Sequence, residues 1–136
     1  MVHTRFFEDL GRVLYVLAIN DGQVQKREQE IVEQLIDEAL LAHPDFNEAS
    51  HLKNAMLTKI SFRNAVRNGM QTAGVVEHFN QQVAEDRVRI GKESLEFAWK
   101  LINGLFDSWK GTNVSEQEQL LHFHRVFFGK DENDGV

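Results

Sequence analysis

Acidic side chains in two short segments are the residues of this chain best suited to hold a metal ion. Asp21 and Glu28 stand in the first segment, and Glu118 stands in the second. Carboxylate oxygens are the ligands that Ca²⁺ and Mg²⁺ prefer in proteins. The three acids are therefore a candidate site for a divalent cation of the calcium or magnesium type.

The spacing of these acids does not fit an EF-hand. The calcium loop of that motif takes oxygen ligands at positions 1, 3, 5, 7, 9 and 12 around a glycine at position 6. With Gly22 in the glycine position, Glu28 falls at the twelfth position, but Leu17 and Ile19 fall at the first and third. The second segment has Trp109 at the third position. Neither segment is an EF-hand loop.

The same acids also have a structural interpretation. A serine at the start of a helix and a glutamate three residues later form a capping box, in which the carboxylate accepts from the backbone amide of the cap. Ser115 and Glu118 have this spacing, and Glu28 stands three residues after Gln25. Asp21 can hold its turn by accepting hydrogen bonds from nearby amides. Capping and metal binding are both open interpretations of these residues.

No pattern of a catalytic site occurs in the chain. It has no glycine-rich phosphate loop, no Gly-x-Ser-x-Gly elbow and no His-Glu-x-x-His zinc motif. It has no cysteine, which excludes thiol nucleophiles and thiolate metal sites. His122 and His124 are two residues apart, so a helix points them to different faces. The sequence therefore predicts a protein that is not an enzyme.

A basic stretch interrupts an otherwise acidic chain, whose net charge is −6. Residues 51–76 contain four basic residues and no acidic one, and Lys59, Arg63 and Arg67 follow each other at steps of four. Such a row lies on one helical face, which can dock an acidic protein or nucleic acid, or can pack beside the acidic first third of the chain. The acidic net charge of the whole chain opposes both kinds of docking, so the basic face must outweigh it. We expect a protein partner rather than nucleic acid.

Apolar residues recur at steps of three and four along most of the chain, which predicts helices. The predicted helices cover about residues 4–19, 25–42, 72–84, 85–109 and 115–128, and Asp45 or Asn47 can cap a further helix that runs through Ile60. In this helix the apolar positions are Leu52, Ala55, Met56 and Ile60, and a break is expected near Gly69. The first helix has so wide an apolar face that we expect it to lie between others. No run alternates with the period of a strand.

The length of 136 residues fits one domain. We therefore predict a single-domain, all-α bundle of five to seven helices over residues 1–129, followed by a polar tail over 130–136. Residues 21–31 and 111–121 share a tight loop, a valine and a glutamate four residues after it, which indicates an internal helix-loop-helix repeat. Neither hairpin can bury its apolar face alone, so the two are expected to pack together.

The stretch from Ala18 to Glu28, placed after an apolar helix, resembles the signature of the TerB-like tellurite-resistance family. The resemblance implies an all-helical domain of two related halves, each with an Asp-Gly loop and a following glutamate. It also implies a divalent-metal site made by the loop acids, and a cytoplasmic role in stress-associated or membrane-associated assemblies. The second half departs from the family pattern, because Gly111-Thr112 replaces Asp-Gly and only Glu118 carries over.

The ends and the hydropathy of the chain predict its location. Glu8 and Asp9 stand where a secretory signal would have an apolar run. The most apolar window, residues 13–19, is much shorter than the roughly 20 residues that span a bilayer. We expect a cytoplasmic protein with no transmembrane segment, and its surface is compatible with a homo-oligomer.

Overall fold

The computed structural model describes residues 2–19, 24–42, 49–109 and 114–129. These residues form α-helices joined by short connections, and no strand occurs in the described ranges. The prediction of an all-α fold is confirmed. None of the helices in these ranges combines the length and the apolar character needed to cross a bilayer. The helices are α1 (Val2–Ala18), α2 (Lys26–Ala42), α3 (Ala49–Asn68), α4 (Val75–Ile90), α5 (Lys92–Trp109) and α6 (Val114–Phe128).

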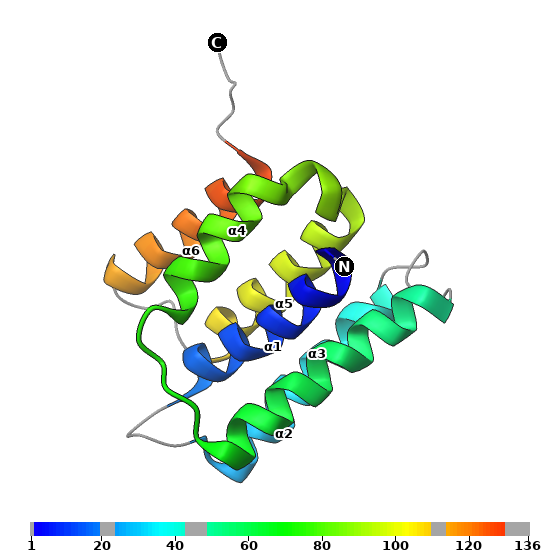
Figure 1. Cartoon of the computed structure of the whole chain (residues 1–136). Coiled ribbons are helices and arrows are strands. Elements are labelled where there is room, and N and C mark those ends of the chain that lie inside the picture. The colour runs from blue at the N-terminus through cyan, green and yellow to red at the C-terminus, as the bar shows by residue number, and fades with distance from the viewer. Residues whose placement is uncertain (1, 20–23, 43–48, 110–113, 130–136) are drawn as a thin grey trace.

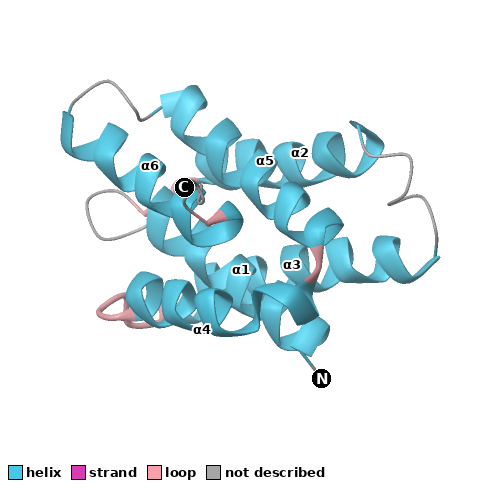
Figure 2. Ribbon diagram, turned by 90° about the horizontal axis from the view of Figure 1, so that it is seen from above, coloured by secondary structure: helices cyan, strands magenta, loops and turns pink. Residues whose placement is uncertain are grey.

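The helices stack as three layers of two (Figures 1 and 2). The middle layer contains α1 and α5. The α2–α3 pair covers one side of it and the α4–α6 pair covers the other. The hairpin of α1 and α2 therefore packs against the hairpin of α5 and α6 through the contacts of α5 with both α1 and α2.

The core lies along the middle layer, because α1 and α5 have neighbours on both sides. On α5 the apolar residues Leu95, Ala98, Ile102, Leu105 and Phe106 recur at steps of three and four and are buried, and so is most of α1. Aromatic rings join the two helices at the centre, where Phe7 meets Phe97 edge-on with ring centroids 6.0 Å apart. The largest fully buried side chains of these two helices are Phe7, Leu10, Leu14, Phe97, Leu101, Ile102 and Phe106.

The backbones of α1 and α3 approach each other closely at Gly11. A Cβ atom added at Gly11 would lie 2.5 Å from the backbone oxygen of Thr58 and 2.7 Å from Cβ of Ser61. Ser61 donates a hydrogen bond of 2.6 Å from Oγ to the backbone oxygen of Glu8, which fixes α3 on α1. The absence of a side chain at position 11 thus determines how α3 lies on the middle layer.

One predicted helix boundary agrees with the structure and another does not. The α3 helix ends at Asn68, and Gly69 follows with a φ of 62°, a conformation that glycine adopts without steric cost. The predicted boundary after Ala84 is wrong. The backbone at Asp86 departs from helical values, with φ −109° and ψ 16°, yet α4 continues through this kink to Ile90. Gly91, with a φ of 91°, separates α4 from α5.

Candidate functional site

The structure describes two of the three predicted metal ligands, Glu28 and Glu118. Asp21 lies outside the described ranges. Glu28 is half-buried in the first turn of α2, and Glu118 is exposed near the start of α6. Among the residues that the structure describes, no group of three or more His, Asp or Glu side chains is arranged to hold a metal ion. The divalent-cation site therefore stays a prediction.

Glu28 caps its own helix. The backbone amide of Gln25 donates a hydrogen bond of 2.8 Å to Oε1 of Glu28, and the amide of Gln29 donates to the backbone oxygen of Gln25 at 2.9 Å. This is the glutamate half of a capping box, with Gln25 in place of the usual serine. The second predicted cap differs, because α6 begins at Val114 and Ser115 lies inside the first turn rather than at the capping position.

Two substitutions separate capping by Glu28 from a role in metal binding. Glu28→Gln keeps an oxygen that can accept from the Gln25 amide, so we expect nearly unchanged stability. Glu28→Ala leaves this amide without its partner and is expected to lower the free energy of unfolding by about 1 kcal/mol. Urea denaturation measures both values. Equal losses in the two variants would contradict the capping role.

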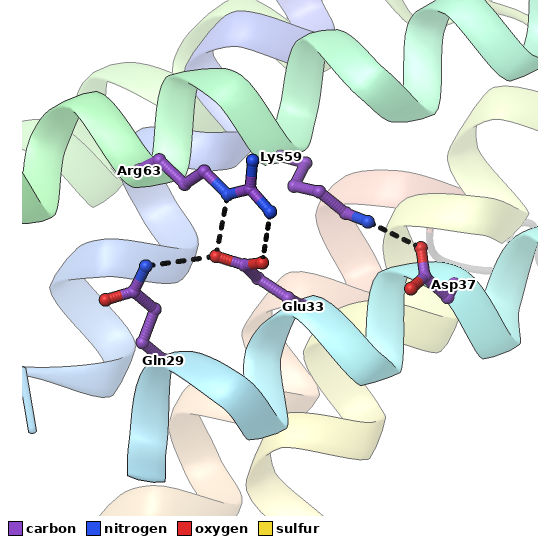
Figure 3. Close-up of polar contacts among 5 residues, drawn as sticks. All are labelled: Gln29, Glu33, Asp37, Lys59 and Arg63. Carbon is purple, nitrogen blue, oxygen red and sulfur yellow. Dashed lines mark hydrogen bonds and ion pairs between the residues drawn. The ribbon is translucent and has the colours of Figure 1, made fainter. Parts of the chain in front are cut away.

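Basic residues of α3 pair with acidic residues of α2 (Figure 3). Arg63 binds Glu33 in a bidentate manner, with Nε to Oε2 at 2.9 Å and Nη2 to Oε1 at 2.6 Å. Lys59 binds Oδ1 of Asp37 at 2.7 Å. For these two residues the structure shows packing beside the acidic first third of the chain, which was one of the two interpretations of the basic stretch. Arg67 lies exposed in the last turn of α3.

The Arg63–Glu33 pair changes the titration of both partners. The hydrogen bond from Arg63 lowers the pKa of the Glu33 carboxyl, and the hydrogen bond from Gln29 Nε2 to Oε2 of Glu33, 3.1 Å long, acts in the same direction. The pKa of Arg63 is raised by the same contact. Burial of Glu33 opposes the effect on its carboxyl but does not cancel it.

The lowered pKa of Glu33 predicts an acid-dependent contribution to stability. A depressed carboxyl pKa stabilises the folded state above the unfolded-state pKa, and this contribution disappears as the pH falls through the folded pKa. Because Arg63 is 49% exposed, the pair is worth at most about 1 kcal/mol. In Arg63→Gln we expect a loss of this size at pH 7 and a shallower loss of stability on acidification, measured by urea denaturation at several pH values. An acid limb as steep as that of the wild type would contradict the assignment.

The outward side of α3 carries an apolar row that the sequence did not predict to be exposed. Leu52, Met56 and Ile60 were assigned to the apolar side of this helix, yet they are 45%, 53% and 48% exposed. The core instead receives the small and aromatic positions Ala55, Thr58, Phe62 and Ala65. The exposed row is every fourth residue, so its members lie on one line. Its exposure accompanies the close approach at Gly11, where the backbone of α3 at Thr58 and Phe62 lies directly against α1.

Positive charge accompanies this apolar row. Lys53 and Arg67 are both exposed, one near each end of α3, and the helix from Ala49 to Asn68 contains no acidic residue. We call the exposed residues Leu52, Lys53, Met56, Ile60, Arg63 and Arg67 the α3 face. This face combines apolar surface with cations.

A cavity of about 210 Å³ lies between α1 and α4. Buried apolar side chains, among them Phe79 and Val83, form much of its wall, and Asp9 and Asp86 lie at its polar side. Burial raises the pKa of Asp9, although Arg12 binds its Oδ1 at 2.7 Å and opposes the shift. Each acid of this cavity is paired within its own helix, Asp9 with Arg12 and Asp86 with Arg89.

Comparison of the chain with protein-family models, with curated proteins and with solved structures finds no match.

Proposed function

We propose that this protein is a non-enzymatic interaction module that binds an acidic, apolar protein segment through the α3 face. The observation that carries the proposal is the row of half-exposed apolar side chains on a helix that has cations and no acid. Partly exposed leucine, methionine and isoleucine side chains on one line form an apolar surface of the kind that partners cover.

The arrangement of the α3 face limits the chemistry of its partner. Leu52 and Ile60 are eight residues apart, which is about 12 Å along a helix. Lys53 and Arg67 are fourteen residues apart, or about 21 Å. A complementary partner presents apolar side chains at its centre and carboxylates toward its ends, as an acidic amphipathic helix does.

Protein is a better partner for this face than nucleic acid. Nucleic-acid sites place several free cations against phosphates, whereas Lys59 and Arg63 are already paired with acids of α2. The apolar row would meet no apolar surface on a phosphate backbone.

The proposal predicts selective binding of an acidic helical peptide. The probe is a fluorescently labelled peptide with leucines on one face and glutamates beside them, and its counterpart has lysines in place of glutamates. Fluorescence anisotropy should detect binding of the acidic probe only. Met56→Glu places a charge in the apolar row and should weaken binding by about tenfold or more.

A matched control separates the α3 face from general surface hydrophobicity. Leu121 lies on α6 and is 48% exposed, close to the value for Met56. Leu121→Glu should therefore leave binding of the peptide unchanged. Equal loss in both variants, equal binding of both peptides, or binding of phosphatidylserine vesicles in place of the peptide would contradict the proposal.

The resemblance to the TerB-like family supports a more specific form of the proposal. In this form the module acts in a stress-related, tellurite-resistance-like assembly and holds a divalent cation with Asp21 and Glu28. Calorimetric titration with Ca²⁺, Mg²⁺, Mn²⁺ and Zn²⁺, repeated on Asp21→Ala, tests the cation. Heat of binding that the variant lacks is the expected result, and no heat with any of the four ions would remove this clause.

A further inference from the structure

We infer that the partner of the α3 face is a second copy of this chain, related to the first by a two-fold axis parallel to α2 and α3. The inference rests on the proposed function and names the occupant of the same surface. The acidic, apolar helix that the α3 face requires is then α2 of the partner subunit.

The α2 helix has the properties that this partner needs. Beyond its first turn, its exposed residues are Glu30, Gln34, Asp37, Glu38 and Leu41. They carry three acids and no base, and Leu41 is 75% exposed. Four of the eight large apolar side chains that are exposed in the described part of the chain lie on α2 and α3 together: Leu41, Leu52, Met56 and Ile60. The other four lie on the α4–α6 layer, so the apolar side chains make the α2–α3 layer a candidate surface for a partner, and its charges and register select that partner.

The ion pairs of Figure 3 fix the register of the two helices. Asp37 binds Lys59 and Glu33 binds Arg63, so each step of four along α2 is matched by a step of four backward along α3. The two helices therefore run antiparallel. By the same register Glu30 is level with Arg67.

The register also places the apolar residues. Leu41 lies four residues beyond Asp37 on α2, and Met56 lies three residues before Lys59 on α3. The two side chains are therefore at nearly the same height on the outer side of the layer. Any symmetry that exchanges α2 with α3 at constant height brings Leu41 of one copy to Met56 of the other.

Charge selects the symmetry axis. Two such layers stack face to face about a two-fold axis that runs either along the helices or across them. An axis across the helices places α2 on α2 and α3 on α3, so that like charges meet. An axis along them places α2 on α3 of the partner subunit at unchanged height, so that acids meet bases.

With the axis along the helices, residues of the α3 face lie opposite complementary residues of α2 in the partner subunit. Glu30 comes opposite Arg67 of the partner subunit, and Leu41 comes opposite Met56 of the partner subunit, each contact occurring twice. The Asp37–Lys59 ion pair of one copy lies against the same ion pair of the second copy in the opposite order. Each acid therefore faces a base, and the four charges alternate in sign about the axis. Self-complementarity of this kind is what an isologous dimer requires.

Sedimentation velocity and light scattering test the assembly. The wild type should reach twice the chain mass of 15.7 kDa as its concentration rises. Met56→Glu should stay monomeric, and Leu121→Glu, on α6, should dimerise as the wild type does. Glu30→Arg and Arg67→Glu should each weaken the dimer by about tenfold, and the double variant should regain it because both charges are exchanged.

Cysteine cross-linking tests the geometry on a chain that has no cysteine of its own. Leu41→Cys chains mixed with Met56→Cys chains should form a mixed disulfide dimer on oxidation. Leu41→Cys mixed with Leu121→Cys should not. Efficient cross-linking of Leu41→Cys with itself would place α2 on α2 and overturn the inference.

The outcomes for the dimer and for the proposed function can be told apart. A wild type that stays monomeric at every concentration overturns the dimer, and if it still binds the acidic peptide through Met56, the proposed function stands with another partner. If it neither dimerises nor binds the peptide, both are wrong. A dimer that Met56→Glu leaves intact uses another surface and also overturns the inference.

Discussion

Gly11→Val is expected to lower the free energy of unfolding by about 3 kcal/mol or to prevent folding, which overpacking of a tight contact can do. Even the Cβ atom would lie 2.5 Å from the backbone oxygen of Thr58 and 2.9 Å from the backbone nitrogen of Phe62. Backbone atoms of a helix cannot move aside as the tip of a side chain does. The whole of α3 would therefore have to shift away from α1, which exposes Phe62.

A second helical glycine provides the control for this prediction. At Gly104 the three atoms nearest to the added Cβ all belong to the Leu35 side chain, with Cδ2 at 3.1 Å, and that side-chain end can rotate. Alanine is favoured over glycine within a helix by about 1 kcal/mol. We therefore expect Gly104→Ala to be neutral or mildly stabilising and Gly11→Ala to be destabilising, both measured by urea denaturation. A stabilising Gly11→Ala would mean that α1 and α3 do not approach as described.

The middle layer was predictable from the sequence because both of its helices, α1 and α5, have wide apolar faces. Leu95, Ile102 and Phe106 recur at helical spacing with large side chains, and all three are buried. The wide apolar face of the first helix correctly indicated a position between other helices. In such helices the apolar pattern of the helix itself predicts which side chains are buried, whichever helices pack against it.

The orientation of α3 was not predictable in the same way. Its largest aliphatic residues, such as Met56 and Ile60, face outward, while Ala55 and Thr58 face α1. Hydrophobicity alone would favour burial of Met56 and Ile60 and exposure of Thr58. The choice depends on Gly11, which stands more than forty residues earlier and lets the backbone of α3 at Thr58 and Phe62 lie against α1. A contact between distant segments thus overrides the local pattern.

The sequence indicated that the basic residues of α3 can pack against acids, but not which acids they bind. The sequence offered packing against acids as one interpretation of the basic stretch, and Lys59 and Arg63 take this role. Which acids they bind depends on the register of two antiparallel helices, which no local spacing encodes. Capping by Glu28 was one of two stated interpretations, because a capping box is a local pattern and is visible in the sequence.

Phe7→Ala is expected to lower the free energy of unfolding by about 3–5 kcal/mol, the range for removing a buried aromatic ring. The side chain is fully buried where α1 meets α5, and it makes edge-on contacts with Phe6 at 5.0 Å and Phe97 at 6.0 Å between ring centroids. Substitution leaves a cavity among helix faces that other layers hold in place, so the site cannot collapse.

The matched control for Phe7 is a ring on the outer layer. Phe128, at the end of α6, is 37% exposed, so Phe128→Ala removes an equal ring from a partly solvated position. Its expected loss is about 1 kcal/mol, because less apolar area leaves water on folding and no closed cavity forms. Urea denaturation of both variants compares the two positions. Since natural domains are stable by only about 5–15 kcal/mol, the Phe7 variant should be partly unfolded under mild conditions. Equal losses at the two positions would contradict a core centred on the contact of α1 with α5.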